Sequence, residues 1–414
     1  MAGDLAIQDE DTRAPALASV PAPVSRQSAS PSPSHLRYLE GLRGLAAIIV
    51  TLQHVYFHTL WGAHLTGWQA TLSTALCWLF PGRAAVAVFI VLSGYLLMRP
   101  VVREGTGQIP GGTWAYLRRR ARRILPPYYA ALAFSIALIL AVPSLRTPVS
   151  PEWADALPPF GFKNLAAHLL LLHNLSWYWA SKIDPPLWTI ATEWQIYFLF
   201  PLILLPAWRR FGNAGSVAIG LTLGLGVYLL TGKGHAAAPW FLGLFALGAA
   251  AASAHSRPST DPSVRLFGWL AAILQTIFAI ITLECAFGML RFLTVDGLPG
   301  LWPDYWAFDL LMGLSSACFL LFAAASQQSN WLVKMLSSRF FVRVGVASFS
   351  LYLIHDPILA ALKVPLDRIH FGPWRQFITM ILAGGVIVAV ATYLFHIVFE
   401  RPFMTAARVR SAEN

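Results

Sequence analysis

Two histidines and a glutamate lie inside long apolar stretches of the sequence, where ionisable side chains are rare. His54, Glu193 and His355 each interrupt a hydrophobic run of helical length. A histidine with a carboxylate neighbour is the usual equipment for general-base activation of a hydroxyl group. The same residue types can also relay protons in a transporter or join two helices as a buried polar pair. The residues alone leave these interpretations open.

The spacing of these residues along their helices brings several of them to a similar depth. Arg43 and His54 are eleven residues apart on one predicted helix. At 3.6 residues per turn they face the same way and are about 16 Å apart along the axis. They could therefore act at two points along one ligand. His355 reaches the depth of His54, and Asp356, which follows it directly, could join them.

The densest positive charge precedes the third predicted membrane helix. Five arginines occupy six positions there: Arg118, Arg119, Arg120, Arg122 and Arg123. Guanidinium groups bind phosphate oxygens with two hydrogen bonds at once. Anchoring at the cytoplasmic face or contact with anionic lipid would also explain a basic segment. Five arginines exceed what orientation requires, so the segment also indicates a phosphate-rich ligand.

The composition identifies the kind of protein that must position these residues. Hydrophobic residues make up 57% of the 414 residues and charged residues 12%, against roughly 25% charged in soluble domains. These values exclude a disordered chain, a collagen, a coiled coil and a soluble globular enzyme. The net charge of +11 is explained by basic residues in cytoplasmic loops, so we expect no nucleic-acid partner. The sequence shows no metal-binding motif, and we predict no metal site.

The hydrophobic runs predict an all-α polytopic membrane protein with about ten transmembrane helices and both termini cytoplasmic. The predicted helices are at 43–60, 84–98, 124–142, 187–207, 215–231, 238–254, 266–288, 306–325, 344–362 and 376–399. Residues 164–180 are apolar too, but counting them as a span would move the later arginine-rich loops to the outer side. We therefore predict an additional re-entrant or interfacial helix there.

The chain divides into three predicted regions. Residues 1–35 are rich in Pro, Ser and Ala and predict a disordered polar N-terminal tail without a signal peptide. Residues 36–403 form the membrane domain, and 404–414 form a short cytoplasmic C-terminal tail.

Six motifs occur in a fixed order along the membrane domain. They lie at residues 38–54, 88–96, 122–129, 187–201, 348–357 and 400–402. With them the sequence resembles the acyltransferase-3 family of integral-membrane O-acyltransferases, from about residue 37 to 403.

The resemblance implies a reaction and a set of site residues. Family members move an acyl group, usually acetyl, from cytoplasmic acyl-CoA to a hydroxyl of a sugar, glycan, lipid or polyketide, with no permanently bound cofactor. Arg43 and His54 match the pair regarded as essential for transfer, and Arg118–Arg123 match the family's basic segment. Glu193 and His355 match its membrane glutamate and late histidine. The chain lacks the C-terminal esterase-like domain of some members, which implies a one-component transferase.

The combined hypothesis is a membrane O-acyltransferase in a plasma or inner membrane, acting on a saccharide, glycolipid or secondary metabolite. In it Arg43 and the five arginines hold the phosphates of acyl-CoA, His54 is the general base, Glu193 orients it and His355 assists. The alternative is a proton-coupled transporter or flippase of a glycan or lipid. That alternative explains the buried histidines and glutamate equally well but the basic segment less well.

Overall fold

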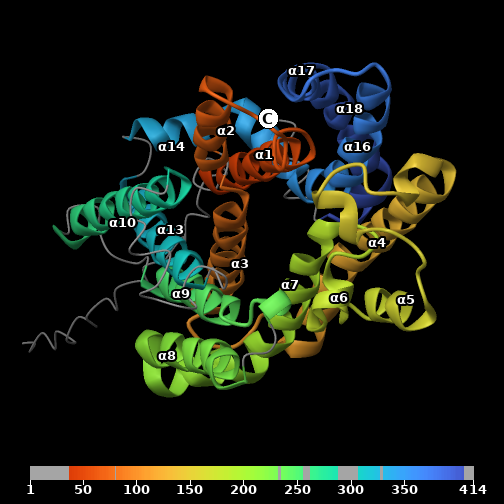
Figure 1. Cartoon of the computed structure of the whole chain (residues 1–414). Helices are drawn as coiled ribbons and strands as arrows, with labels where there is room; N and C mark the ends of the chain where they lie inside the picture. The colour runs from red at the N-terminus through yellow and green to blue at the C-terminus, as the bar shows by residue number, and fades with distance from the viewer. Residues whose placement is uncertain are drawn as a thin grey trace, which may run out of the picture. The chain divides into compact units, whose positions relative to one another are not determined.

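The structure, a computed structural model, describes residues 37–79, 81–231, 235–254, 262–287, 306–326 and 330–404. These residues form helices joined by loops, with no β-strand among them (Figure 1). The predicted N-terminal tail and nearly all of the predicted C-terminal tail lie outside the described residues.

The longer helices in chain order are α1 (Arg37–Thr59), α3 (Gly82–Arg103), α4 (Gly112–Ala141), α7 (Trp188–Leu199), α8 (Leu205–Thr231), α9 (Phe241–Ala254), α10 (Pro262–Phe287), α13 (Trp306–Ser326), α16 (Ser348–Arg368) and α18 (Gly385–Phe395). The shorter ones are α2 (Trp68–Leu79), α5 (Phe162–Leu169), α6 (Trp177–Ala180), α14 (Trp331–Leu336), α15 (Arg339–Val346) and α17 (Pro373–Thr379).

Each predicted membrane segment coincides with helix in the structure. Within the described residues, six helical stretches are long and apolar enough to cross a membrane, and the chain is a multi-pass membrane protein. They are Gly82–Arg103, Gly112–Ala141, Pro185–Thr231, Trp306–Ala325, Ser348–Arg368 and Pro373–Phe403. The helix α1 has Arg37, Glu40 and Arg43 in its first two turns, which lowers its hydropathy. The count of ten therefore stays a prediction.

Two segments differ from a simple hydrophobic run. The helix α4 begins at Gly112, well before the predicted start at 124, because arginine is a good helix former and continues the helix beyond its apolar part. Residues 164–180 form short helices instead of one, with Leu171 at a positive φ of 53° between α5 and α6. Neither helix approaches the roughly 20 residues that a span needs.

Glycines set how closely the central helices pack. A Cβ on Gly94 of α3 would lie 2.0 Å from the Phe245 carbonyl oxygen, and one on Gly248 of α9 would lie 1.9 Å from that of Val91. Small residues allow the backbones of membrane helices to approach in this way. The helices α1 and α15 meet similarly, where a Cβ on Gly345 would lie 1.8 Å from a backbone oxygen of α1.

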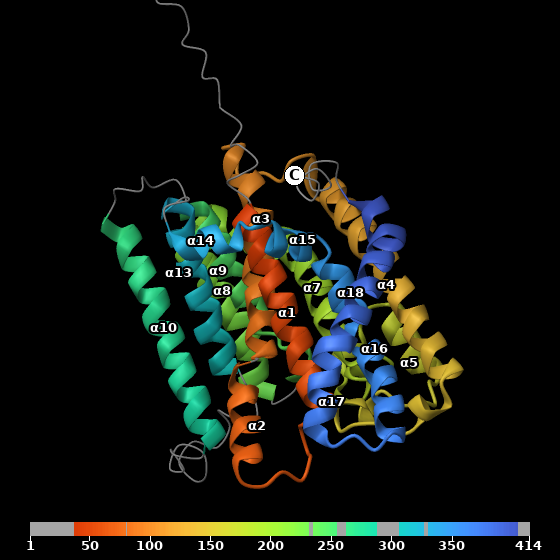
Figure 2. The ribbon, with the colours of Figure 1, turned by 90° about the horizontal axis from the view of Figure 1, so that it is seen from above.

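The helix α16 has a central place in the packing. It contacts α1 on one side and α4 and α18 on others, and most of its first half is buried. Figure 2 shows α14 and α15 at one end of the helices and α2 and α17 at the opposite end. We call the end with α14 and α15 the arginine end. The helix α1 begins there in contact with both of them, and Arg43 lies about two turns from its first residue.

Candidate functional site

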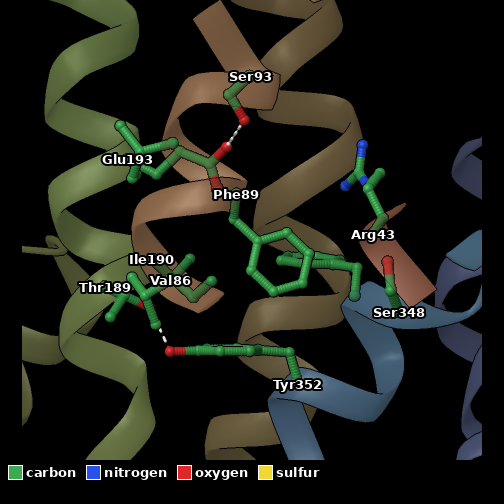
Figure 3. A pocket seen from close by; sticks show the side chains of 11 residues that line it. Arg43, Val86, Phe89, Ser93, Thr189, Ile190, Glu193, Ser348 and Tyr352 are labelled. Carbon is green, nitrogen blue, oxygen red and sulfur yellow. Dashed lines mark hydrogen bonds between the residues drawn. The ribbon is translucent and has the colours of Figure 1, made fainter. Parts of the chain in front are cut away.

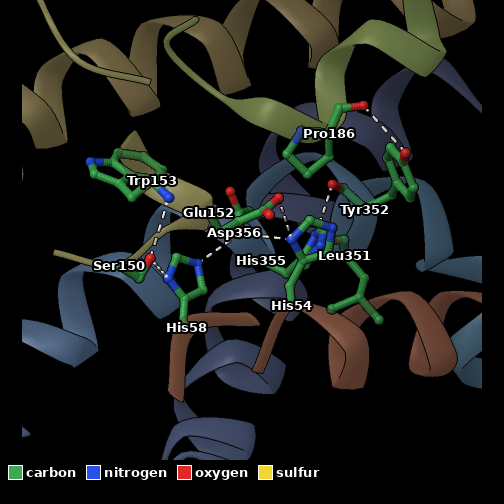
Figure 4. Close-up of polar contacts among 10 residues, drawn as sticks. All are labelled: His54, His58, Ser150, Glu152, Trp153, Pro186, Leu351, Tyr352, His355 and Asp356. Carbon is green, nitrogen blue, oxygen red and sulfur yellow. Dashed lines mark hydrogen bonds and ion pairs between the residues drawn. The ribbon is translucent and has the colours of Figure 1, made fainter. Parts of the chain in front are cut away.

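A cluster of histidines and carboxylates lies where α1 meets α16 (Figure 4). One oxygen of Asp356, Oδ1, lies 3.0 Å from His54 Nδ1 and 2.8 Å from His58 Nε2. The two histidines are four residues apart, so they lie on the same face of α1. Asp356 is fully buried, and a buried carboxylate needs such partners to stay ionised. The cluster therefore holds both imidazoles in fixed orientations.

The segment between α4 and α7 adds a second carboxylate to this cluster. Glu152, at the start of the short helix η3 (Glu152–Asp155), places Oε1 3.4 Å from His54 Nδ1. Burial raises the pKa of Glu152, against the lowering effect of His54. Asp184, on the same segment, accepts a hydrogen bond of 2.9 Å from Ser135, and burial raises its pKa well above the usual range.

His355 lies against His54, with ring centroids 4.9 Å apart. Its Nδ1 is 3.0 and 2.9 Å from the carbonyl oxygens of Leu351 and Tyr352, which can only accept. Nδ1 therefore carries the proton, and Nε2 presents a lone pair. That buried Nε2 has no hydrogen-bond partner among the described residues. His355 is thus ready to accept a hydrogen bond from a ligand.

A cavity lies between α1, α3, α7 and α16, and the empty space in it, open solvent included, is about 430 Å³ (Figure 3). It is lined by Arg43, Val86, Phe89, Ile90, Ser93, Thr189, Ile190, Glu193, Ser348, Phe349 and Tyr352. Arg43 and Ser348 lie toward the arginine end, whereas the ring of Tyr352 lies 5.8 Å from that of His355. The cavity therefore leads from Arg43 toward the histidine cluster.

Glu193 lies in the wall of this cavity. Its carboxylate accepts hydrogen bonds from the Ser93 hydroxyl, at 2.5 Å, and from Tyr197. The carboxylates that contact His54 are those of Asp356 and Glu152. The structure thus brings His54 and His355 together, whereas Glu193 lies in the cavity wall with Ser93 and Tyr197.

The arginines of α4 divide into two sets. Arg120 and Arg123 are half-buried and one helical turn apart, whereas Arg118, Arg119 and Arg122 are exposed. The inward pair shares an electrostatic environment with Arg43. Two buried guanidinium nitrogens, Arg43 Nε and Arg120 Nε, have no hydrogen-bond partner in the described part of the chain, whereas Arg123 Nη2 forms an ion pair with Glu400 Oε1 at 3.6 Å. Unpaired buried donors of this kind are suited to an anion.

Three residues could also hold a cation. His54, Glu152 and Asp356 each offer one ligand atom, all within 4.8 Å of one another. The Oδ1 atom of Asp356 already accepts hydrogen bonds or ion pairs from two imidazoles, and a metal ion would have to displace them.

Sequence reasoning did not identify His58, Ser150 and Glu152. The spacing of His54 and His58 could have revealed the first, since residues four apart share a helix face. Ser150 and Glu152 lie in a polar loop more than ninety residues from α1, where such residues are ordinary. Only the fold brings them to the histidines.

The chain is similar to known acyltransferases. A family model described as an acyltransferase domain matches residues 36–396. The peptidoglycan O-acetyltransferase OatA of Listeria monocytogenes is 21% identical over 382 residues, covering 86% of this chain and 54% of that protein. The O-acetyltransferase OatA of Staphylococcus aureus is 23% identical over 351 residues, covering 79% and 51%. The chain thus spans about half the length of these curated relatives. No solved structure matches it.

Proposed function

Because the chain belongs to the acyltransferase-3 family, we propose that it transfers an acetyl group from acyl-CoA to an acceptor hydroxyl. One observation carries the proposal. Arg43, which has a buried nitrogen without a hydrogen-bond partner among the described residues, lies at one end of a cavity, and a histidine in contact with a buried carboxylate lies beyond the other end. This arrangement suits a donor whose charged end is a set of phosphates and whose reactive end is a thioester.

The donor binds with its phosphates at the arginine end. Arg43, Arg120 and Arg123 offer fixed, always-charged forks that match phosphate oxygens. The pantetheine arm occupies the cavity between apolar side chains such as Phe89 and Ile190. The thioester then lies near Tyr352, next to the histidine cluster.

His54 acts on the acceptor hydroxyl as general base. Its Nδ1 forms an ion-pair contact of 3.0 Å with Asp356 Oδ1, and Nε2 serves as the basic nitrogen. Overall, the acceptor hydroxyl loses its proton to Nε2, its oxygen forms a bond to the acyl carbon, and CoA departs as the thiol. Asp356 and Glu152 stabilise the imidazolium that forms. The free Nε2 of His355 accepts a hydrogen bond that positions the acceptor.

The acceptor is a saccharide of the cell envelope and the membrane is the plasma membrane. This part of the proposal is supported by the relative from Listeria monocytogenes, whose name assigns it to peptidoglycan. The segment between α4 and α7, which brings Glu152 to His54, is on the side where such an acceptor would enter.

Acetyl transfer in isolated membranes tests this function. Membranes containing the chain are incubated with acetyl-CoA labelled in the acetyl group and with cell-wall saccharides, and label on the saccharide is measured. His54→Ala should lower the rate by about 10²-fold or more, as for loss of a general base. The exposed loop residue His64 provides the control, since His64→Ala should transfer normally. Full activity of His54→Ala would refute the assigned base.

A further inference from the structure

Within the histidine cluster, a series of hydrogen bonds links Asp356 through His58 to the hydroxyl group of Ser150. His58 Nε2 lies 2.8 Å from Asp356 Oδ1, and His58 Nδ1 lies 2.8 Å from Ser150 Oγ. The three residues come from α1, α16 and the segment before η3 (Figure 4). An imidazole between a carboxylate and a hydroxyl is the arrangement that activates a serine as a nucleophile.

The carboxylate of Asp356 decides which nitrogen of His58 carries a proton. An ionised carboxylate only accepts hydrogen bonds, so His58 Nε2 carries a proton and Nδ1 presents a lone pair. The Ser150 hydroxyl must then donate to Nδ1. The backbone N–H of Trp153 donates to Ser150 Oγ at 3.2 Å, which fixes the oxygen in place. The hydroxyl is thus aligned for loss of its proton to His58.

The surroundings place Ser150 next to the reaction centre. It is 7% exposed, and His58 1%, so bulk water is largely excluded from the bond between them. Glu152, two residues further on, contacts His54. His54 and His58 share Asp356 Oδ1, so the thioester that reaches His54 is close to Ser150. A serine with only a structural role at the start of η3 would need only the hydrogen bond from the Trp153 N–H, and the hydrogen bond to His58 would have no function.

We propose that Ser150 carries the acyl group as an ester between acyl-CoA and the acceptor; this inference rests on the proposed acyltransferase function. In the first half-reaction Ser150 Oγ attacks the thioester carbon and its proton passes to His58 Nδ1. The carbon–sulfur bond breaks, and the departing thiolate takes a proton from protonated His54. Atoms and charge balance, and CoA leaves as the thiol.

The second half-reaction reverses the roles of the two histidines. The acceptor hydroxyl gives its proton to His54, now neutral, and its oxygen attacks the ester carbon. The bond from that carbon to Ser150 Oγ breaks, and Ser150 recovers a proton from His58. The acceptor ester leaves, and both histidines return to their initial protonation states. His54 and His58 therefore alternate as acid and base on either side of one carboxylate.

Trapping the ester tests this inference. The purified full-length protein in lipid nanodiscs is given acetyl-CoA labelled in the acetyl group, without acceptor, and quenched with acid. Peptide mass spectrometry should locate one acetyl group on Ser150. Added saccharide should remove it and become labelled. His58→Gln, which cannot take up the proton, should slow labelling by about 10²-fold or more.

Two substitutions at Ser150 and one control complete the test. Ser150→Ala should abolish labelling and transfer, whereas Ser150→Cys should be labelled through a thioester that neutral hydroxylamine releases. The control is Ser144→Ala, at a half-buried serine of the same segment, which should behave as wild type. Wild-type transfer without an acetyl group on Ser150 in quenched turnover would overturn the inference, whatever the variants do. Failure of the wild type to acetylate any saccharide would instead count against the proposed function.

Discussion

At the residue scale, the arginines of α4 differ in where they point. Arg120 is half-buried and has a buried nitrogen without a hydrogen-bond partner among the described residues, while Arg118, two residues earlier, is exposed. Replacing the guanidinium fork of Arg120 by a lysine removes paired hydrogen bonds to a phosphate. Such charged hydrogen bonds contribute about 1.5–3 kcal/mol each. Arg120→Lys should therefore raise the KM for acetyl-CoA by about 10-fold or more.

The matched control for this prediction is Arg118→Lys. It makes the same chemical change at an exposed position and should leave the KM for acetyl-CoA unchanged in initial-rate measurements. An equal rise in both variants would show that the net charge of the segment, and not the inward fork, attracts the donor.

A site residue can be predicted from the sequence when its type is unusual among its sequence neighbours. His54, Glu193 and His355 stand out because an ionisable residue in an apolar run is costly and rare. Asp356 is found beside His355 for the same reason. Ser150 and Glu152 lie in a polar loop, where their types carry no signal, and only tertiary structure joins them to α1. The partner of His54 could not be chosen from depth alone, since both Asp356 and Glu193 were candidates.

At the scale of helices, the contact of α3 with α9 depends on two glycines. Gly94→Ala would place a Cβ 2.0 Å from a backbone oxygen of α9, which forces the helices apart. Overpacking of this kind costs about 1–3 kcal/mol. We expect Gly94→Ala to lower the thermal unfolding temperature in detergent. Gly226 on α8 has open space around its Cβ position, so Gly226→Ala should leave that temperature unchanged or raise it. Equal stability of both variants would contradict the packing described.

The segment between α4 and α7 contains a pair of stacked histidines that should make stability depend on pH. His173 is fully buried against His168, with ring centroids 4.1 Å apart. Burial lowers the pKa of His173 to about 3, from the ordinary value of 6.5. A neutral imidazole is therefore favoured in the folded state. Its contribution to stability is complete above pH 6.5 and is lost as the pH falls toward 3.

A ring that cannot ionise tests this dependence. His173→Phe should retain the stack and show a smaller fall in unfolding temperature between pH 6.5 and acidic pH than the wild type. His64→Phe, at an exposed histidine, should keep the wild-type slope. Identical slopes for His173→Phe and the wild type would contradict a buried neutral His173.

Hydrophobic runs predict the membrane helices well because length and apolarity are what a span requires. They miss helices whose formation does not depend on a run of apolar residues. The first turns of α4 are rich in arginine, and α2, α14 and α15 are short or have apolar residues on one face only. These helices form by packing against longer ones, which the sequence of a single segment does not reveal.

At the scale of the whole membrane domain, α1 and α16 each contribute first a cavity residue and then, further along the helix, a residue of the histidine cluster. Arg43 and Ser348 line the cavity near the arginine end, and His54 and Asp356 meet eleven and eight residues further along. The two helices therefore run in the same direction through the site. In the proposed function, this arrangement connects a donor on one face of the membrane to an acceptor on the other, which is the central claim.

Sidedness of the substrates tests that claim most directly. The protein is reconstituted into sealed proteoliposomes, its orientation is established by protease accessibility of its termini, and labelled acetyl-CoA and cell-wall saccharide are supplied on chosen sides. Acetylated saccharide should form only when acetyl-CoA is on the face of Arg120 and Arg123 and the saccharide is on the face of Glu152. Transfer that requires acetyl-CoA on the Glu152 face would contradict the account.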